Sequence, residues 1–173
     1  PVLITNCSNN FGPWQFPEKL IPLVILKALN LEKIPIYGNG ENIRDWLFID
    51  DHISALLCVA ANAKPGSCYC IGGSQELTNN QIVLKICEVL DTLRPSKEPY
   101  KNLINYVDDR PGHDLRYAIN ANKIRKELEW KPNFDFNESI KITIKWYLTN
   151  LEWCKNIKEK SGYHGQRLGK NTK

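Results

Sequence analysis

The segment Asp109-Arg110-Pro111-Gly112-His113 joins residue types that bind an anion to residue types that fix a turn. Arg110 offers a planar fork of N–H donors that matches phosphate oxygens, and an anionic ligand would favour the protonated form of His113. Pro111 fixes its own φ and restricts the residue before it, while Gly112 can adopt backbone angles closed to other residues. The pattern indicates phosphate binding, and a plain surface turn with an Asp–Arg pair is the alternative interpretation.

A second arginine occurs in the run Arg44-Asp45-Trp46, and it could clamp a diphosphate together with Arg110. Each charge-assisted hydrogen bond to such a ligand would contribute about 1.5–3 kcal/mol. Candidates for catalysis are scarce, because no serine lies in a G-x-S-x-G motif. His52 falls at the start of a predicted amphipathic helix, where a place on the helix surface is favoured, and His164 lies near the end of the sequence. The residues therefore indicate a binding site and not a reaction.

The composition is that of a folded chain without membrane spans. The 173 residues are 42% hydrophobic and 24% charged, which suits one domain or one and a half. Much of the net charge of +4 lies in residues 154–173, interpreted as a solvated basic tail with too few aromatic residues to indicate a nucleic-acid partner. The six cysteines show no metal-binding spacing, and no apolar run reaches the length of a membrane helix. We therefore predict a reducing, cytoplasmic location with no membrane partner.

Alternating strands and helices must position the arginines. The predicted strands are residues 2–7, 35–37, 44–49, 68–71 and 103–107, with 116–119 extended, and the predicted helices are 19–29, 50 or 51 to 63, 78 onward, 120–128 and 135 onward. This alternation is typical of α/β proteins. Residues 8–17 are predicted to form a loop at the carboxyl end of a parallel strand, where open α/β sheets bind ligands.

Three local features refine this prediction. Asp50 or Asp51 is expected to cap the second helix, whose apolar face would carry Ile53 and Leu57. Trp130, Trp146 and Trp153 are expected to pack between elements and not to contact a ligand. The sequence also enters directly into an apolar strand that implies sheet neighbours, so we interpret it as a fragment.

Five motifs in order carry a resemblance to a known family: residues 6–13, 16–22, 35–38, 44–47 and 109–116. Together they resemble the carboxyl-terminal half of the dTDP-glucose 4,6-dehydratase family, which belongs to the extended short-chain dehydrogenases/reductases. The resemblance spans residues 1 to about 153. Related sugar-nucleotide epimerases and dehydratases share parts of the pattern, but Ile43-Arg44-Asp45-Trp46 together with the 109–114 segment favours the deoxythymidine enzymes.

The resemblance implies a fold and a reaction. The fold would be the last strands and helices of an incomplete Rossmann domain, interleaved with a smaller α/β substrate-binding domain. Residues 1–73 would be mostly Rossmann domain with an excursion at about 14–40, residues 74–153 the substrate-binding domain, and residues 154–173 the basic tail. The complete family enzyme is implied to be a homodimeric, NAD-dependent lyase that converts dTDP-glucose to dTDP-4-keto-6-deoxyglucose plus water and feeds deoxysugar pathways such as rhamnose synthesis.

The resemblance also implies roles for residues inside the matched motifs and in the tail. Asn10 would contact the nicotinamide side of NAD. The residues implied to bind the dTDP-sugar come from all parts of the sequence. Asn9 would contact the sugar nucleotide, Lys19 and Leu20 would line the pocket, and Pro35 and Tyr37 would flank the thymine. Arg44, Asn79, Arg110 and His113 would hold the nucleotide and its diphosphate, and Tyr163 would close over the nucleotide.

The family's reaction machinery is missing from the sequence. Its glycine-rich NAD loop, Tyr-x-x-x-Lys pair and acid–base pair would all precede residue 1, and no G-x-G-x-x-G occurs here. Tyr117 and Tyr147 are followed four residues later by Ala121 and Leu151, not by lysine. We therefore expect no catalytic residue in this chain and no activity from it alone. Three hypotheses stay open: half of a truncated or split dehydratase with a separate amino-terminal partner, a non-catalytic nucleotide-sugar-binding module, and a fragment of a sister epimerase or dehydratase.

Overall fold

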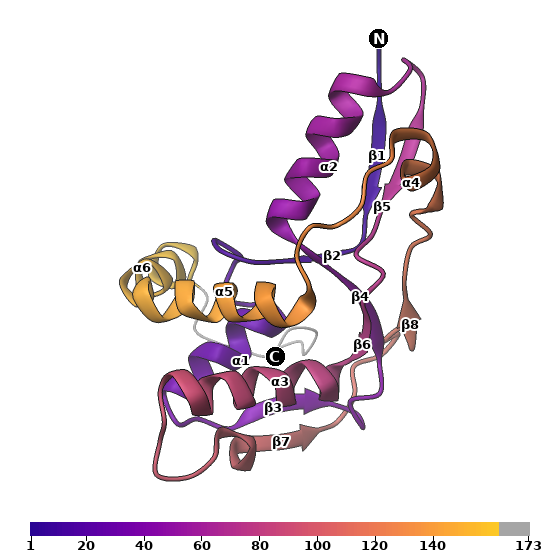
Figure 1. Cartoon of the computed structure of the whole chain (residues 1–173). Coiled ribbons are helices and arrows are strands. Elements are labelled where there is room, and N and C mark those ends of the chain that lie inside the picture. The colour runs from indigo at the N-terminus through magenta and orange to yellow at the C-terminus, as the bar shows by residue number, and fades with distance from the viewer. Residues whose placement is uncertain (163–173) are drawn as a thin grey trace.

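Parallel strand pairs form the framework of the chain, and the computed structural model describes residues 1–162 (Figure 1). Strand β1 (Ile4–Cys7) pairs with β5 (Cys68–Ile71), and β3 (Ile34–Tyr37) pairs with β7 (Ile104–Val107), both in parallel. Strand β4 links these regions: its partners are β2 (Asn9–Phe11) and β8 (Arg116–Tyr117) in parallel and β6 (Glu76–Thr78) antiparallel. Strand β4 itself spans Ile43–Phe48. The predicted α/β class is thus confirmed.

The helices alternate with the strands. They are α1 (Leu20–Leu29), α2 (Ile49–Asn62), α3 (Asn79–Leu93), the 3₁₀ helix η1 (Tyr100–Leu103), α4 (Asn122–Leu128), α5 (Phe136–Thr149) and α6 (Leu151–Ser161). Helix α3 begins with a capping box, in which the Thr78 hydroxyl accepts from the Gln81 N–H and the Gln81 side chain accepts from the Thr78 N–H. Asp135 caps α5 by accepting from the Glu138 N–H. These side chains explain why both helices begin where the sequence predicted.

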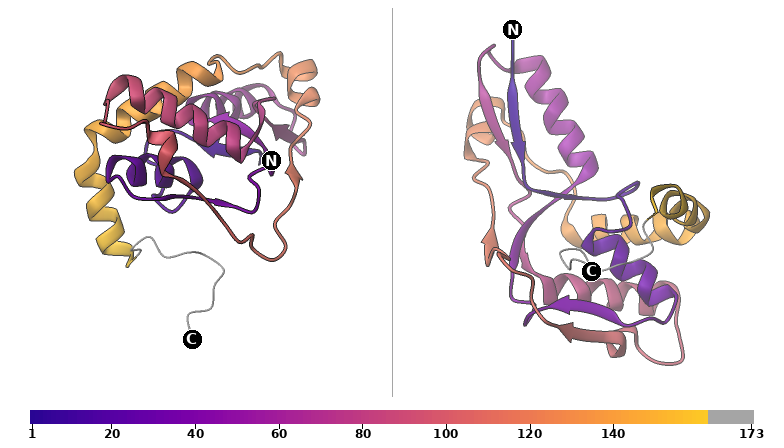
Figure 2. Two further views of the ribbon diagram at one scale, coloured as in Figure 1. Left: turned by 90° about the horizontal axis from the view of Figure 1, so that it is seen from below. Right: turned by 180° about the vertical axis from the view of Figure 1, so that it is seen from behind.

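Two hydrophobic clusters hold the elements together. The larger lies among α1, β3, α3 and α5 and includes the buried residues Ile25, Ile36, Ile86 and Ile144. The smaller lies among α2, β5 and α4, at the end of the molecule that carries the N-terminus, and Figure 2 shows the ribbon from two further sides. Strand β4 contributes to both, since Trp46 packs in the larger cluster and Leu47 in the smaller. The alternation of side chains along one strand therefore joins the two clusters.

The start of α2 differs from the prediction. The helix begins at Ile49 with no side-chain cap, so the predicted capping role of Asp50 or Asp51 is wrong. The Asp51 carboxylate is 2% exposed and accepts from the backbone N–H groups of Asn133 and Phe134, at 2.7 and 3.4 Å. The Asp51 carboxylate therefore accepts hydrogen bonds from backbone N–H groups more than eighty residues away and does not cap its own helix.

The loop predicted for residues 8–17 also differs, because it contains the short strand β2.

The apolar residues Val2, Ile4, Ile53 and Leu57 remain exposed, at 68, 53, 48 and 66%. Helix α2 instead buries Asp51, Ala55 and Val59. Among the described residues, β1 pairs with β5 alone. The end of the molecule around β1 and α2 thus presents apolar side chains and an open strand edge (Figure 1).

The tryptophans pack as predicted. Trp130 is 7% exposed, and its indole N–H donates to the Ser54 hydroxyl at 2.9 Å. Trp146 and Trp153 lie with ring centroids 5.2 Å apart, and both contact the ring of Trp14. This aromatic cluster joins α5 and α6 to the loop that follows β2.

Candidate functional site

A cavity of about 670 Å³ lies among β2, α1, β3, β4 and the turn after β7. Every binding residue that the sequence predicted within residues 1–162 lines this one cavity: Asn9, Asn10, Lys19, Leu20, Pro35, Tyr37, Arg44, Asn79, Arg110 and His113. Tyr163 lies outside the described residues. The topology explains the gathering, because Asn9, Tyr37 and Arg44 stand on three separate strands whose connections turn around the same space.

Arg44 is the most enclosed cation of the cavity, with 9% of the residue exposed. Its guanidinium donates to the carbonyl oxygens of Ile43 and Asp114, at 2.7 and 2.9 Å. Burial lowers the pKa of Arg44, the Asp114 carboxylate opposes this shift, and the nearby charge of Arg110 lowers the pKa further. Two arginines near enough to repel each other across a cavity are a site that an anion would stabilise.

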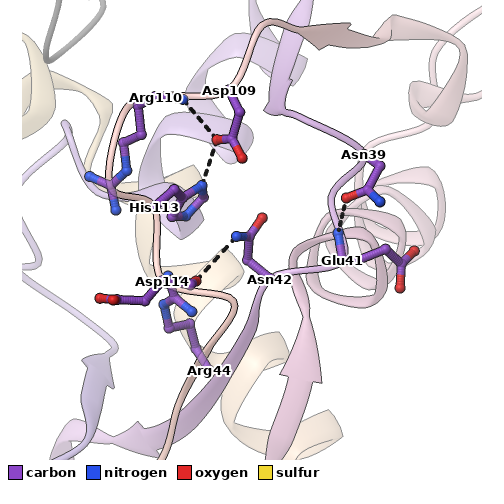
Figure 3. Close-up of polar contacts among 8 residues, drawn as sticks. All are labelled: Asn39, Glu41, Asn42, Arg44, Asp109, Arg110, His113 and Asp114. Atoms are coloured by element: carbon purple, nitrogen blue, oxygen red, sulfur yellow. Dashed lines mark hydrogen bonds and ion pairs between the residues drawn. The ribbon is translucent and has the colours of Figure 1, made fainter.

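Two side chains at the start of β4 hold Asp114 in place (Figure 3). Its carbonyl accepts from the Asn42 amide at 3.2 Å as well as from Arg44. Asn42 was not predicted from the sequence, because its role depends on a contact with a residue 72 positions later. These bonds tie the start of β4 to the segment that follows the 109–113 turn.

The 109–113 turn has the rigid form that its sequence predicts. Gly112 adopts φ of +67°, in the left-handed region. The Asp109 carboxylate accepts from the Arg110 N–H at 2.8 Å and lies 2.7 Å from Nδ1 of His113 (Figure 3). The hydrogen bond from His113 is the main reason that the pKa of Asp109 is lowered. With Nδ1 held by Asp109, Nε2 is the ring nitrogen of His113 left for a ligand.

The ring of His113 also packs against the cavity wall. Its side chain is only 8% exposed, and its ring meets that of Tyr37 edge to face at 6.5 Å between centroids. The Arg110 side chain, in contrast, belongs to an exposed residue and extends from the turn (Figure 3). The turn therefore combines a fixed imidazole with a guanidinium that can adjust to a ligand.

Asn10 and Gln15 form the opposite end of the cavity lining. The Asn10 amide N–H₂ donates to the Ser8 carbonyl and to the Cys7 sulfur, both at 3.1 Å. Gln15 donates to the Asn10 carbonyl at 2.8 Å, and the buried Tyr147 hydroxyl donates to the Gln15 carbonyl at 2.6 Å. Within the described residues, the side-chain oxygens of Asn10 and Gln15 are buried and have no hydrogen-bond partner. Such acceptors at a cavity wall are available to a donor on a ligand once side chains adjust.

Several lining residues were not predicted from the sequence. They are Gln15, Glu18, Leu23, Lys27, Lys33, Trp46 and Val107. Leu20, Leu23 and Lys27 share a helical spacing and are the half-buried stripe of α1, which was a usable signal. Gln15 and Trp46 carried no such signal, because loop and sheet geometry alone bring them to the cavity.

Gly38 offers a test of the turn's packing. Its φ is +60°, and a Cβ there would lie 2.9 Å from Oδ2 of Asp109. We expect the backbone strain in Gly38→Ala to lower the free energy of unfolding by about 1–2 kcal/mol. The displacement of Asp109 by the new Cβ should lower it further. Gly66 is the matched control, since its φ is +85° and a Cβ at that residue would have no atom within 4 Å.

Urea denaturation of both variants measures the difference. Gly38→Ala is expected to be the more destabilised and to disturb the Asp109–His113 contact, which the His113 ring resonances report by NMR. Equal destabilisation with unchanged His113 resonances would contradict a packed turn.

Comparison with known proteins identifies the fold around this cavity. The family model for GDP-mannose 4,6 dehydratase matches residues 1–143. The chain belongs to this family. A dTDP-glucose 4,6-dehydratase from Shigella flexneri is 53% identical over 158 residues, which are 91% of this chain and 44% of that protein. The chain is thus a homologue of the dTDP-glucose 4,6-dehydratases, as its motifs predicted.

Solved structures agree with the family assignment. A dTDP-glucose 4,6-dehydratase from Bacillus anthracis in complex with NAD superimposes with a TM-score of 0.81 at 44% identity, over 91% of this chain and 47% of that one. A dTDP-glucose 4,6-dehydratase from Streptomyces venezuelae with NAD and TYD bound gives 0.80 at 39% identity, over 90% of this chain and 46% of that one. The chain therefore spans about half the length of the relatives it matches.

Residues 1–162 contain neither a membrane-spanning helix nor a metal-binding cluster. No helix there is long and apolar enough to span a membrane. No cluster of His, Cys, Asp and Glu there has the size of a metal site.

Proposed function

We propose that the cavity binds a dTDP-sugar and that the chain supplies the sugar-nucleotide-binding part of a dTDP-glucose 4,6-dehydratase. One observation carries this proposal: residues of five separate sequence motifs converge on a single cavity with two arginines and a histidine on its wall. Homologues of the chain bind NAD and dTDP-sugars. The proposal concerns binding and orientation of the substrate by this chain's own residues.

The cavity suits the three parts of such a ligand. Arg44, Arg110 and protonated His113 would hold the diphosphate, because together they supply both positive charge and directed N–H donors. Pro35 and Tyr37 would flank the thymine ring, for which they offer flat, largely apolar surfaces. The positive end of α3, where Asn79 stands, adds a favourable field for the anion.

The sugar would lie toward the amide side chains. Asn9 would contact the sugar nucleotide and Lys19 and Leu20 would line its path, as the family resemblance implies. These residues would orient the hexose. Among the described residues that line the cavity, Glu18 is the one carboxylate, and it is bound to Lys19 at 2.7 Å. The lining therefore offers no other acid–base pair of this kind for proton transfer. Substrate positioning is therefore the proposed contribution of this chain.

NAD fits one residue of the cavity. The unpartnered Oδ1 of Asn10 is an acceptor suited to the carboxamide N–H₂ of a nicotinamide. When bound, NAD would supply hydride transfer in the complete enzyme. Asn10 would orient that ring, and the phosphate-binding glycine-rich turn would have to come from another polypeptide segment.

The remaining expectations belong to the same proposal. The region around β1, α2 and β5 would complete a Rossmann domain, and residues 74–153 with the 14–40 excursion would form the substrate-binding domain. The complete enzyme would be a cytoplasmic homodimer. The exposed apolar residues of β1 and α2 support this division, because an incomplete sheet would leave such a surface.

Calorimetric titration of the purified chain tests the binding proposal. We expect dTDP to bind with measurable heat, and more tightly than ADP, because Pro35 and Tyr37 are proposed to flank a pyrimidine. A preference for UDP over dTDP would favour a sister epimerase or dehydratase. Absence of binding by every nucleoside diphosphate would contradict the proposed site.

A further inference from the structure

The carboxyl-terminal end of α1 closes with a turn that fixes the position of one cavity lysine. The Leu31 N–H donates to the Ala28 carbonyl and the Glu32 N–H donates to the Lys27 carbonyl, both at 2.9 Å, while Leu31 adopts φ of +56°. This is a Schellman motif, in which the N–H of the second residue after the C-cap donates to the carbonyl of the third residue from the end of the helix. The two residues that meet here are Glu32 and Lys27.

Their side chains form an ion pair where many such helix ends have an apolar contact. Nζ of Lys27 donates to Oε2 of Glu32 at 2.9 Å, and the Asn30 amide donates to Oε1 of the same carboxylate at 3.0 Å. The bond from Lys27 is the main reason that the pKa of Glu32 is lowered. The Lys27 side chain is 22% exposed, so backbone geometry and two hydrogen bonds hold its ammonium in a partly enclosed place.

Lys27 belongs to the stripe of α1 that faces the cavity. Leu20, Leu23 and Lys27 are three and four residues apart, all three line the cavity, and the residues between them are buried in the core. Lys33, which precedes β3, and Pro35, within β3, line the same cavity. After the turn at 30–33 the chain reverses, so the start of β3 lies by the end of α1 and Tyr37 lies farther along, against His113.

The proposed function orients the ligand along this wall. With the diphosphate at Arg44, Arg110 and His113, and the base lying against Pro35 and Tyr37, the outer edge of the base would face the end of α1, because Lys33, Pro35 and Tyr37 follow one another from that end toward His113. Lys27 is the tethered polar group of that end. One of its three N–H donors is used by Glu32, which leaves two for the ligand.

An ammonium group can discriminate between pyrimidines, because it donates hydrogen bonds and accepts none. Thymine and uracil carry an oxygen at position 4, which accepts, whereas cytosine carries an amino group there, which donates. A donor fixed opposite position 4 therefore gains a hydrogen bond with the first two and faces another donor in the third.

We propose that Lys27, held by Glu32, is the residue that selects a 4-oxo pyrimidine over a 4-amino pyrimidine in this cavity. This inference rests on the proposed function, since it takes the placement of the base from it. It adds a specificity-determining residue, and a reason for its geometry, that the motifs of the family resemblance do not include.

Titration with dUDP and dCDP tests the inference, because the two ligands share deoxyribose and diphosphate and differ at the pyrimidine ring. We expect the unaltered chain to bind dUDP at least about tenfold more tightly than dCDP, the equivalent of one charge-assisted hydrogen bond. Lys27→Met should bring the two affinities within about threefold of each other. Lys27→Arg, which keeps a donor without an acceptor, should retain the preference.

Lys33→Met is the matched control. Lys33 lines the same cavity and carries the same charge, but it is exposed and no ion pair of its side chain is found among residues 1–162. Lys33→Met should weaken the binding of dUDP and dCDP equally and so keep the ratio of their affinities, because loss of a remote charge affects only the shared diphosphate. Thermal melting of each variant confirms that it is folded.

The outcomes separate the inference from the function it rests on. A Lys27→Met chain that keeps the dUDP preference, or an unaltered chain that binds dUDP and dCDP equally, would overturn the inference and leave the dTDP-sugar site in place. Failure of the unaltered chain to bind any of dTDP, dUDP and dCDP would overturn the proposed function and the inference with it.

Discussion

Formation of the 4-keto sugar from dTDP-glucose is expected only when this chain is combined with a polypeptide that carries the NAD-binding loop and the acid–base residues. The part of the Bacillus anthracis relative that this chain does not match is a suitable partner, since the matched parts are 44% identical. The chain alone should show no turnover, because it contains no G-x-G-x-x-G and no Tyr-x-x-x-Lys. Absorbance of the keto sugar in alkali measures the product for each polypeptide alone and for both together.

The surface around β1 and α2 is where the partner should bind. The open edge of β1 can accept a further strand, and the exposed Ile53 and Leu57 of α2 can be covered by the partner. Leu57→Glu should therefore abolish the restored activity, whereas Leu84→Glu, at a 43% exposed leucine on α3, should not. Turnover by this chain alone, or full activity with Leu57→Glu, would contradict the assignment of this surface.

Arg110→Ala is expected to weaken dTDP binding by about 1.5–3 kcal/mol, the value of a hydrogen bond to a charged group. The guanidinium extends from the turn into the cavity lining, and the nearby Arg44 is already committed to two carbonyl oxygens. Arg110→Lys should restore only part of the affinity, because a lysine cannot donate in the bidentate manner. Calorimetry with dTDP measures all three chains.

Arg94→Ala controls for the loss of an arginine. Arg94 is the exposed C-cap of α3, at the opposite end of that helix from Asn79, and it does not line the cavity. Its removal should leave the affinity for dTDP unchanged at moderate ionic strength. Unchanged affinity in Arg110→Ala would exclude the phosphate clamp.

Local chemistry made much of the fold predictable from the sequence. Thr78 and Asp135 cap their helices through their own neighbours, so the beginnings of α3 and α5 could be placed from a few residues. The 109–113 turn was equally local, because Pro111 and Gly112 restrict the backbone wherever the segment lies. Strand β2 was missed because Asn9–Phe11 is held by pairing with β4 and not by its own composition.

The site shows the same division. The arginines and the histidine were found because their residue types indicate anion binding, and the other predicted ligands came from the family resemblance. Asn42 and Tyr147 could not be found, since each acts through a contact with a residue more than seventy positions away. Asp51 was misassigned for the same reason: a carboxylate at a helix start indicates a cap, but its partners lie at residues 133–134.

The apolar face of α2 is a different case. Its spacing indicated an apolar face, and Ile53 and Leu57 of that face are exposed in the described structure. An apolar stripe on a helix indicates a packing surface, but the pattern is the same whether that surface packs within its own chain or against another polypeptide. The pattern therefore predicted the helix and its apolar face, while the side that is covered within the described structure carries Ala55 and Val59.

A crystal structure of the chain with dTDP bound tests the central claim most directly. We predict that the diphosphate lies between Arg44, Arg110 and His113, that the thymine lies against Pro35 and Tyr37, and that its 4-oxygen lies within hydrogen-bond distance of Lys27. A nucleotide bound elsewhere on the chain, or bound in this cavity with its phosphates away from both arginines, would contradict it.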